Sequence, residues 1–520
     1  MQVPVPLLGK ARRRSRRGQA MVLSALSLLV LALMVTLSFN LSHALRQKMS
    51  LQQHSDALAY SMAVLEARAL NYYAVGNRAI AGSYVAMNSL HAYMAAVSVT
   101  GEMLRAARNN FYMIAAIEVV RCMCYGCQEH CIDAAEAMKI AGDFAKEGSD
   151  YDKKARGVES GFTNAMQGLD LMVDNLHIAQ RSVHDKTLQS VRDGKSNGLE
   201  QLTEYNAPGA TFLTQQVGSM NANEFNCAVD GMQCQGSEDD SDEEARARVM
   251  TEVANASRSG WPATRETGGM PSVQIPSYLH PEFMKKFKDI PNEGNYQVMR
   301  HVGTAKTAED KGQVNGAGEQ GGNSGKVVVA TEEGTIFHKW RHGVGINNYK
   351  AEVWSDDGGG GHTPNGAHSG QHPFEGVNAR ALTACSQSGN CFMKFRANPD
   401  ADRDWGQPRV YSYVTRQFRG GDPSKTPWEL NSSSTLEFEH GAQGSGRLKL
   451  AADEGAGLSK ALVYYHRFGQ GGWKEPPNLF GPYWRAKLHP FRDGDEAGRV
   501  LEAAGNQDAA ELARVPGVSL

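Results

Sequence analysis

Apolar residues dominate one stretch near the start of the chain. Residues 20–39 form a twenty-residue apolar run that is broken only by Ser and Thr. A helix rises ~1.5 Å per residue, so twenty residues span the ~30 Å hydrocarbon core of a bilayer. No other segment of the sequence is as long and as free of charge. The pattern therefore predicts a single membrane-spanning helix at residues 19–41.

A basic cluster precedes this run and consists of Lys10, Arg12, Arg13, Arg14, Arg16 and Arg17. Basic flanks of membrane helices stay in the cytoplasm, so we expect the chain after the helix to lie outside it. The apolar part of a secretory signal usually has ~7–15 residues, which favours an uncleaved anchor here. Small residues in Ser42-His43-Ala44 leave cleavage after Ala44 as an alternative.

Helical periodicity continues beyond the membrane segment. Apolar residues recur every three or four positions through residues 42–207, which places them on one face of a helix. Alternating spacings of three and four are typical of antiparallel helices packed as a bundle or a short coiled coil. Gly148-Ser149-Asp150 is the turn that we expect between two of these helices.

Proline and glycine divide the sequence in two. Seventeen of the 19 prolines and 42 of the 55 glycines lie from Pro208 onward. Proline interrupts helices, so the second part is expected to consist of strands, turns and loops. Alternating or β-branched stretches predict strands at 326–331, 335–340, 409–418, 435–439, 447–451 and 461–467.

These patterns together predict an α+β architecture. A single N-terminal transmembrane helix continues into an elongated helical stalk or bundle, and a β-rich, loop-rich distal domain follows. With 520 residues and a net charge of −2, the chain is long enough for several domains, and its charge gives no basis for nucleic-acid binding. The expected parts are a basic cytoplasmic segment (1–18), the transmembrane helix (19–41), a periplasmic helical stalk (42–207), a linker and irregular region (208–325), the β-rich domain (326–492), and a C-terminal helix and tail (493–520).

The eight cysteines fall into three local groups. An even number of clustered cysteines outside the cytoplasm is typical of local disulfides. We therefore expect the pairs Cys227–Cys234 and Cys385–Cys391, each of which closes a short loop. The third group comprises Cys122, Cys124, Cys127 and Cys131. These cysteines have the spacing of metal-binding thiolates but lack a second ligand cluster, so their state stays open between disulfides and a metal.

Two further segments carry potential metal ligands. His362, His368 and His372 lie in a glycine-rich loop without the glutamate of a zinc-peptidase motif, and solvated histidines are the favoured interpretation. Carboxylates alternate at Asp400, Asp402 and Asp404, which is a weak calcium pattern because Tyr411 stands where the loop of an EF-hand has its glutamate. Signature motifs of hydrolases and of nucleotide-binding enzymes are absent from the sequence, so we assign no catalytic residue, no metal site and no cofactor.

Both ends of the chain resemble TadE/TadG-like proteins of the Flp-type (tight adherence) pilus machinery. The N-terminal resemblance rests on Arg17-Gly18-Gln19-Ala20, the apolar helix, Leu51-Gln52, Asp56-Ala57-Leu58-Ala59, Asn71-Tyr72-Tyr73-Ala74 and Asn77-Arg78-Ala79-Ile80-Ala81. The C-terminal resemblance rests on Tyr464-Tyr465-His466-Arg467 and on the segment from Trp473 through Asn478 and Pro482 to Trp484-Arg485.

The chain departs from that family at two points. Pseudopilin-like relatives are cut after a glycine such as Gly18 and carry a glutamate five residues later, where this chain has Leu23. Processing after Gly18 therefore stays open. The metal-binding DxSxS motif of many TadG-like proteins is also missing, so their adhesive metal chemistry is not carried over.

The resemblance implies a non-enzymatic, single-pass protein of the bacterial inner membrane that takes part in Flp/Tad-type pilus assembly or an allied secretion system. Its partners would be pilus or secretion-system membrane proteins, contacted through the membrane helix and its extension over residues 20–80. A membrane-tethered extracytoplasmic adhesin or binding module is the first alternative. An exported metal-dependent hydrolase is the second. The sequence does not predict the direct partner or the oligomeric state.

Overall fold

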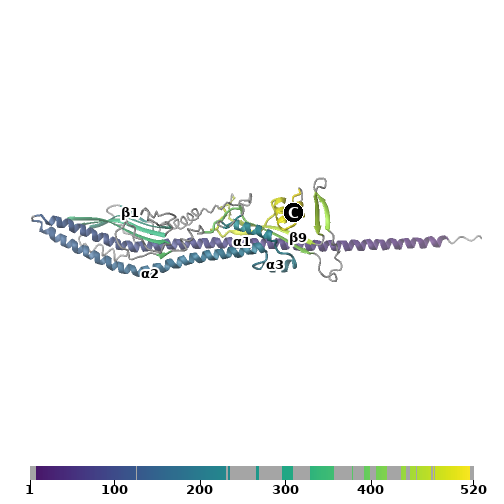
Figure 1. The fold of residues 1–520 in the computed structure, drawn as a ribbon, viewed down its shortest axis with the longest axis horizontal. Coiled ribbons are helices and arrows are strands. Elements are labelled where there is room, and N and C mark those ends of the chain that lie inside the picture. The colour runs from purple at the N-terminus through teal and green to yellow at the C-terminus, as the bar shows by residue number, and fades with distance from the viewer. Residues whose placement is uncertain are drawn as a thin grey trace, which may run out of the picture.

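The computed structural model describes residues 8–124, 126–229, 232, 234, 265–268, 295–307, 328–356, 377–378, 392–398, 406–417, 435–440, 446–451, 454–469, 472–473 and 475–515. The molecule is elongated, and one helix, α1 (Leu8–Cys122), runs along it from end to end (Figure 1). Its 115 residues correspond to a length of ~170 Å. The proline-free sequence explains why this helix continues from the apolar run without a break.

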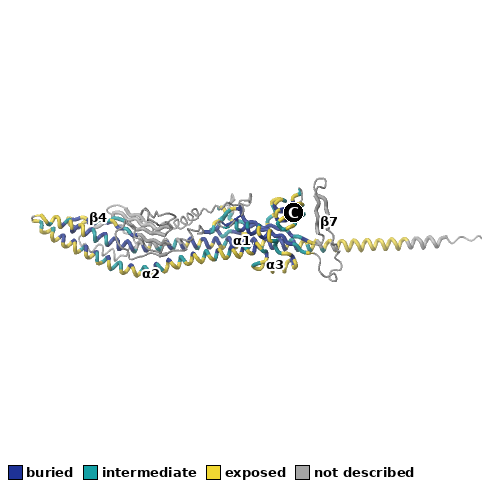
Figure 2. The backbone as a smooth tube through the Cα atoms, viewed as in Figure 1, coloured by how far each residue is buried: buried dark blue, intermediate teal, exposed yellow. Residues whose placement is uncertain are grey.

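The apolar run is the exposed part of α1. Among the described residues, one helix is long and apolar enough to cross a membrane, and its most apolar window has a mean hydropathy of 2.6. Side chains of this run are exposed along its whole length (Figure 2). The hydroxyl groups of Ser24 and Thr36 donate hydrogen bonds to backbone carbonyls four residues earlier, so these polar groups are satisfied within the helix.

A second helix, α2 (Gln128–Asp193), returns antiparallel to α1 and packs along it. The buried rings of Phe111 and Phe144 stack between the two helices, with centroids 5.7 Å apart. The turn that we expected at residues 148–150 is wrong, because α2 passes through these positions and Gly148 is buried within it. The chain instead reverses between Cys122 and Gln128.

Two short helices follow α2. A left-handed Gly194 ends α2, and α3 (Leu199–Asn206) and α4 (Gln215–Cys227) come next. The Thr214 side chain accepts a hydrogen bond from the Val217 backbone N–H and caps the start of α4. At Gly218, α4 lies so close to the end of α2 that an added Cβ would meet the Arg192 carbonyl oxygen at 1.8 Å.

A five-stranded sheet lies near the end of the molecule at which α1 meets α2 (Figure 1). Its order is β1 (Arg265–Gly268), β2 (Asn295–Thr307), β3 (Val328–Trp340), β4 (Gly343–Asp356) and β5 (Val377–Asn378), and all pairs are antiparallel except β4–β5. Gly345 allows β4 to approach α1 closely, since an added Cβ would lie 2.6 Å from the Asn110 carbonyl oxygen.

A three-stranded antiparallel sheet packs on α1 nearer to the apolar run. Its strands are β12 (Trp484–Leu488), β9 (Glu454–Tyr465) and β6 (Arg409–Gln417), in that order. The shared core combines Leu51, Leu58, Met62 and Leu70 of α1 with residues of all three strands. Burial of this apolar surface is the main source of stability at this end of the body.

Smaller elements complete the described part. The pairs β7–β8 (Thr435–His440, Gly446–Ala451) and β10–β11 (Phe468–Gly469, Gly472–Trp473) are antiparallel ladders. At the C-terminus, α8 (Gly494–Ala503) and α9 (Gln507–Ala513) pack on each other and on β6, burying Ala497, Leu501 and Ala510. The sequence predicts one surface helix and a tail here. The structure instead has two helices, and their apolar residues are buried against each other and against β6.

The mixture of helix and strand is confirmed, and the described strands of the two larger sheets pack on α1. Strands β6, β7 and β8 coincide with predicted segments, β3 joins two predicted strands, and β9 overlaps one in part. The strands that were missed are β1, β2, β4, β5, β10, β11 and β12. Both larger sheets lie alongside α1 instead of beyond it, and the C-terminus lies part of the way back toward the apolar run (Figure 1). The chain therefore folds back along its own first helix.

Candidate functional sites

The first candidate site is the surface of α1 predicted to contact partners, residues 20–80. The structure splits this range in two. Leu58 and Met62 are fully buried against the strands of the same chain, so they are not available to a partner. Leu41, Leu45 and Met49, by contrast, are 60 %, 55 % and 61 % exposed. We call these three residues the juxtamembrane stripe, because they follow the apolar run at helical spacing.

Side-chain amides fix α1 to the C-terminal strands. The Gln52 amide donates to the Leu458 carbonyl at 2.8 Å and accepts from the Leu458 N–H at 3.3 Å. Asn71 makes the same pair of bonds with the backbone of Trp484, both at 2.9 Å. Asn77 donates to the Leu479 carbonyl at 2.7 Å. These amides satisfy backbone groups that would otherwise be buried without partners.

The segments that carry the two ends of the resemblance therefore meet in space. Gln52, Asn71 and Asn77 belong to the N-terminal pattern, and Leu479 and Trp484 belong to the C-terminal one. They are separated by about four hundred residues in the sequence. The pattern thus includes the polar contacts that hold one folded unit together.

A second candidate site is a buried cluster of charged groups at the junction of α4, β6, β9 and α8. Arg409 binds both carboxylate oxygens of Glu224, at 3.0 and 3.2 Å. Lys460 contacts Glu496 at 2.7 Å, and the Tyr411 hydroxyl donates to Glu496 at 2.9 Å. Burial raises the pKa of Glu224, and Arg409 opposes that shift.

An open cleft of about 550 Å³ borders this cluster. Gln215, Ser219 and Asn223 of α4 and Arg499 of α8 line it beside Glu224 and Arg409. Each buried charge in the cluster faces a charge of opposite sign, which is how a structural ion network is built. The polar lining suits binding of a small polar group, whereas the paired charges give no free nucleophile or base.

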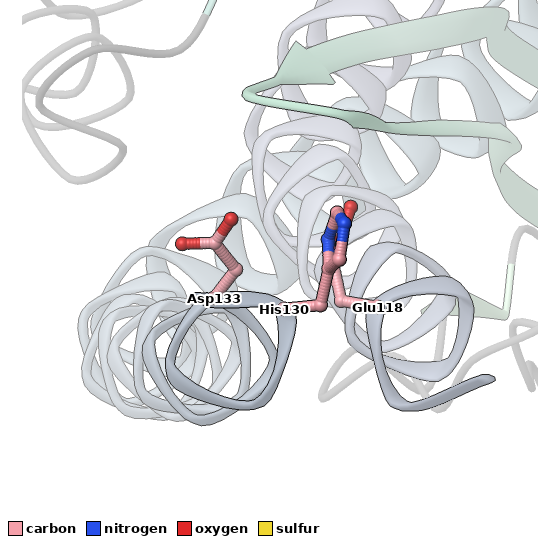
Figure 3. Close-up of side chains that lie close together, drawn as sticks. All are labelled: Glu118, His130 and Asp133. Carbon is pink, nitrogen blue, oxygen red and sulfur yellow. The ribbon is translucent and has the colours of Figure 1, made fainter. Parts of the chain in front are cut away.

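The third candidate site is the end of the helical hairpin, where α1 passes into α2. Glu118, His130 and Asp133 come together there from the two helices, with one possible ligand atom of each within 4.8 Å of the others (Figure 3). Such a trio could hold a metal ion. However, His130 Nδ1 lies 2.5 Å from Glu118, Arg121 contacts Glu118, and Arg341 pairs with Asp133. The arginines thus supply the positive charge that a metal would bring.

Sequence reasoning did not single out this trio. His130 and Asp133 have the i, i+3 spacing of helical neighbours, but Glu118 joins them only because the chain reverses between residues 122 and 128. The reversal was predicted elsewhere, so the sequence offered no reason to bring Glu118 close.

The structure contains one disulfide that the sequence predicts and a second one in the cysteine group whose state was open. Cys227–Cys234 is a disulfide, as predicted. In the group whose state was open, Cys122 and Cys131 are bonded with Cα atoms 4.9 Å apart, and Cys124 and Cys127 remain thiols. The disulfide links the last residue of α1 to the first turn of α2, so it fixes the hairpin end.

Several predicted site residues lie outside the described residues. They are the loop histidines His362, His368 and His372, the carboxylates Asp400, Asp402 and Asp404, and the pair Cys385 and Cys391. Their predicted roles stay predictions.

Together, the long apolar helix and the disulfides fit an exported, membrane-anchored protein. Comparisons with protein-family models, with characterised proteins and with solved structures find no match to this chain. The function of this chain must therefore be argued from its sequence and structure alone.

Proposed function

We propose that this chain is a non-enzymatic component of Flp/Tad-type pilus assembly or of an allied secretion system, anchored in the bacterial inner membrane. Its N-terminus lies in the cytoplasm and its body in the periplasm. The observation that carries the proposal is the meeting of the two resembling segments, through Asn71 with Trp484 and Asn77 with Leu479. Residues on which the resemblance rests thus make specific polar contacts with one another, which supports a likeness beyond shared hydrophobicity.

Partner binding is assigned to the exposed part of α1. Residues 20–39 face outward along their whole length, and the juxtamembrane stripe extends this surface beyond the membrane. Membrane helices associate side by side through close packing in the bilayer. Pilus or secretion-system membrane proteins with one such helix would fit this surface, and the buried positions Leu58 and Met62 would not take part.

The test places charge on the juxtamembrane stripe. The double variant Leu45→Glu, Met49→Glu should abolish surface pili, because two carboxylates would have to be desolvated in the partner contact. Folding of the body should be unchanged, since both residues are exposed. The matched control is Leu171→Glu on α2, where the wild-type side chain is 61 % exposed and lies beyond Gln180, the α2 residue that is hydrogen-bonded to Tyr73 of α1.

Two measurements read the result. Counting pili on cells shows the loss of assembly, and a photo-crosslinker at Leu45, compared with one at Leu171, should join the chain to a pilus-system membrane protein at the first position only. Normal piliation by the double variant, at wild-type protein levels, would refute the assignment.

The anchor itself is tested by sequencing the N-terminus of protein extracted from membranes. We expect a start before Gly18. A start at Gln19 would mean processing after Gly18, and a start at Leu45 would mean cleavage after Ala44, so either result removes the uncleaved anchor.

The polar cleft beside Glu224 and Arg409 supports the runner-up, a membrane-tethered binding module. Replacing Arg499 at its rim by Glu should then reduce adhesion to surfaces while pili are still assembled. Under the pilus-assembly proposal, the same variant should leave both properties unchanged.

A further inference from the structure

Four cysteines are concentrated at the end of the hairpin. The helix α1 ends at Cys122 and α2 begins at Gln128, so the chain reverses within five residues. The disulfide Cys122–Cys131 spans this reversal. Cys124 and Cys127 lie inside it as an exposed and a half-buried thiol.

A backbone hydrogen bond links the two remaining cysteines. The Cys127 N–H donates to the Cys124 carbonyl oxygen at 3.3 Å. A four-residue turn brings its first and last Cα atoms within ~7 Å, which overlaps the ~4.4–6.8 Å span that a disulfide requires. Gly126, with φ of +91°, adopts the left-handed conformation that lets this turn close.

The side chains also face one another. The Cys124 thiol is close enough to that of Cys127 to raise its pKa. In a regular helix these cysteines would point along one face, and a bond between Cys124 and Cys127 would require a distorted turn. The break in the helix at Cys122 is what brings them together.

We propose that Cys124 and Cys127 form a second disulfide in the exported protein, nested inside Cys122–Cys131. Two S–H bonds break and one S–S bond forms. The two electrons and two protons pass to the disulfide of a thiol-oxidising catalyst, of the class that oxidises exported proteins. The product is a doubly cross-linked turn at the end of a hairpin that extends ~120 Å beyond the apolar run.

The chemistry of the pair indicates why a catalyst is needed. Burial and the neighbouring Cys124 raise the pKa of the Cys127 thiol. The thiolate is the attacking form in disulfide exchange, so the raised pKa slows attack by the Cys127 sulfur.

Metal binding is the competing use of a CxxC pair. Tetrahedral sites take four ligands, and Cys122 and Cys131 are already bonded to each other. The nearest imidazole along the chain, His130, contacts Glu118. The nested disulfide uses only groups that are already in place.

The inference goes beyond the proposed role in pilus assembly. It rests on export of the body, and Cys227–Cys234 acts as an internal reporter of export because it is remote from the hairpin end. A failure of the inference can therefore be told apart from a failure of the topology.

The experiment uses the full-length protein from cells quenched in acid, which is then denatured at mildly alkaline pH in an excess of iodoacetamide. Trypsin cleaves after Arg121 and Lys139, so one peptide, residues 122–139, contains all four cysteines. Without reduction, we expect this peptide to carry no alkyl group and to weigh four hydrogen masses less than the fully reduced form. With reduction before alkylation, it should carry four alkyl groups.

Two variants establish the pairing. In Cys124→Ser, one alkyl group should appear, and fragmentation should place it on Cys127. In Cys124→Ser, Cys127→Ser, the peptide should stay unlabelled, because Cys122–Cys131 is intact. A wild-type peptide with two alkyl groups or with bound zinc overturns the inference while Cys227–Cys234 remains oxidised. Alkylation at Cys122 in the single variant overturns it as well, since the pairing is then different. Free thiols at Cys227 and Cys234 would overturn both the inference and the export of the body.

Discussion

Replacing Leu58 by Ala tests whether α1 is a core element of the body or a surface for partners. Leu58 is fully buried among residues of β6, β9 and β12. The change removes three carbon atoms, which corresponds to about 2.4 kcal/mol of lost transfer free energy at ~0.8 kcal/mol per methylene group. The cavity that remains adds to this loss, so we expect the free energy of unfolding to fall by about 3–4 kcal/mol.

The assay is urea unfolding of the detergent-solubilised protein, followed by tryptophan fluorescence. Trp484 lies in the same core and reports on it. The matched control is Leu45→Ala, one of the exposed leucines of the same helix, for which the change should be within about 0.5 kcal/mol. If Leu58→Ala and Leu45→Ala unfold alike, the packing of the strands on α1 is not as described, and Leu58 returns as a partner residue.

Further predictions concern buried charge and close packing. Glu66 is fully buried, and neither of its oxygens has a hydrogen-bond partner among the described residues. Burial, and then the nearby Glu224, raise the pKa of Glu66 well above 4.5. The folded state therefore holds a proton that the unfolded state releases above pH 4.5. The free energy of unfolding should fall as the pH rises from there toward the folded pKa, by up to about 1.4 kcal/mol per pH unit. In urea unfolding measured across pH, Glu66→Gln should remove this part of the pH dependence. Arg409→Met should cost about 3–5 kcal/mol in the same assay, because the buried carboxylate of Glu224 would lose its arginine partner while Glu496 keeps Lys460, and a loss below 1 kcal/mol would contradict the ion network. Gly218→Ala should lower the melting temperature, since its Cβ would overlap the Arg192 carbonyl, whereas Gly168→Ala, in open space on α2, should raise stability by about 0.5–1 kcal/mol.

Local pattern was sufficient for the helices and for several strands. The absence of proline between Pro6 and Pro208 and the spacing of apolar residues predict long helices, and α1 and α2 are long helices. The position of the turn could not be read in the same way. Gly148 is buried within α2, and an added Cβ would make only an ordinary contact with Leu104 at 3.7 Å, so this glycine marks neither a turn nor a tight approach. The real turn depends on Gly126 and on a disulfide.

The fold-back of the chain was not predictable from periodicity. It depends on contacts such as Gln52 with Leu458 and Asn71 with Trp484, which join residues about four hundred positions apart. A polar residue among apolar ones on α1 indicates a hydrogen bond but does not name its partner. The predicted partner surface was therefore too long, since burial by strands of the same chain removes its second half.

The fold-back also bears on the choice between an assembly component and a binding module displayed on an anchor. A displayed module has its own core and would fold without the anchor helix. Here the core of the three-stranded sheet includes Leu51, Leu58 and Met62 of α1, and the amides of Gln52 and Asn71 complete its backbone hydrogen bonds. A chain beginning after residue 80 would expose that apolar surface to water and leave those backbone groups without their partners, so it should aggregate when expressed. The helix that enters the membrane is thus a part of the body, and any partner bound along residues 20–49 contacts an element that is continuous with both sheets and with the hairpin end. If the shortened chain instead folded as a soluble monomer with native Cys227–Cys234, the body would be an independent module and the adhesin alternative would gain.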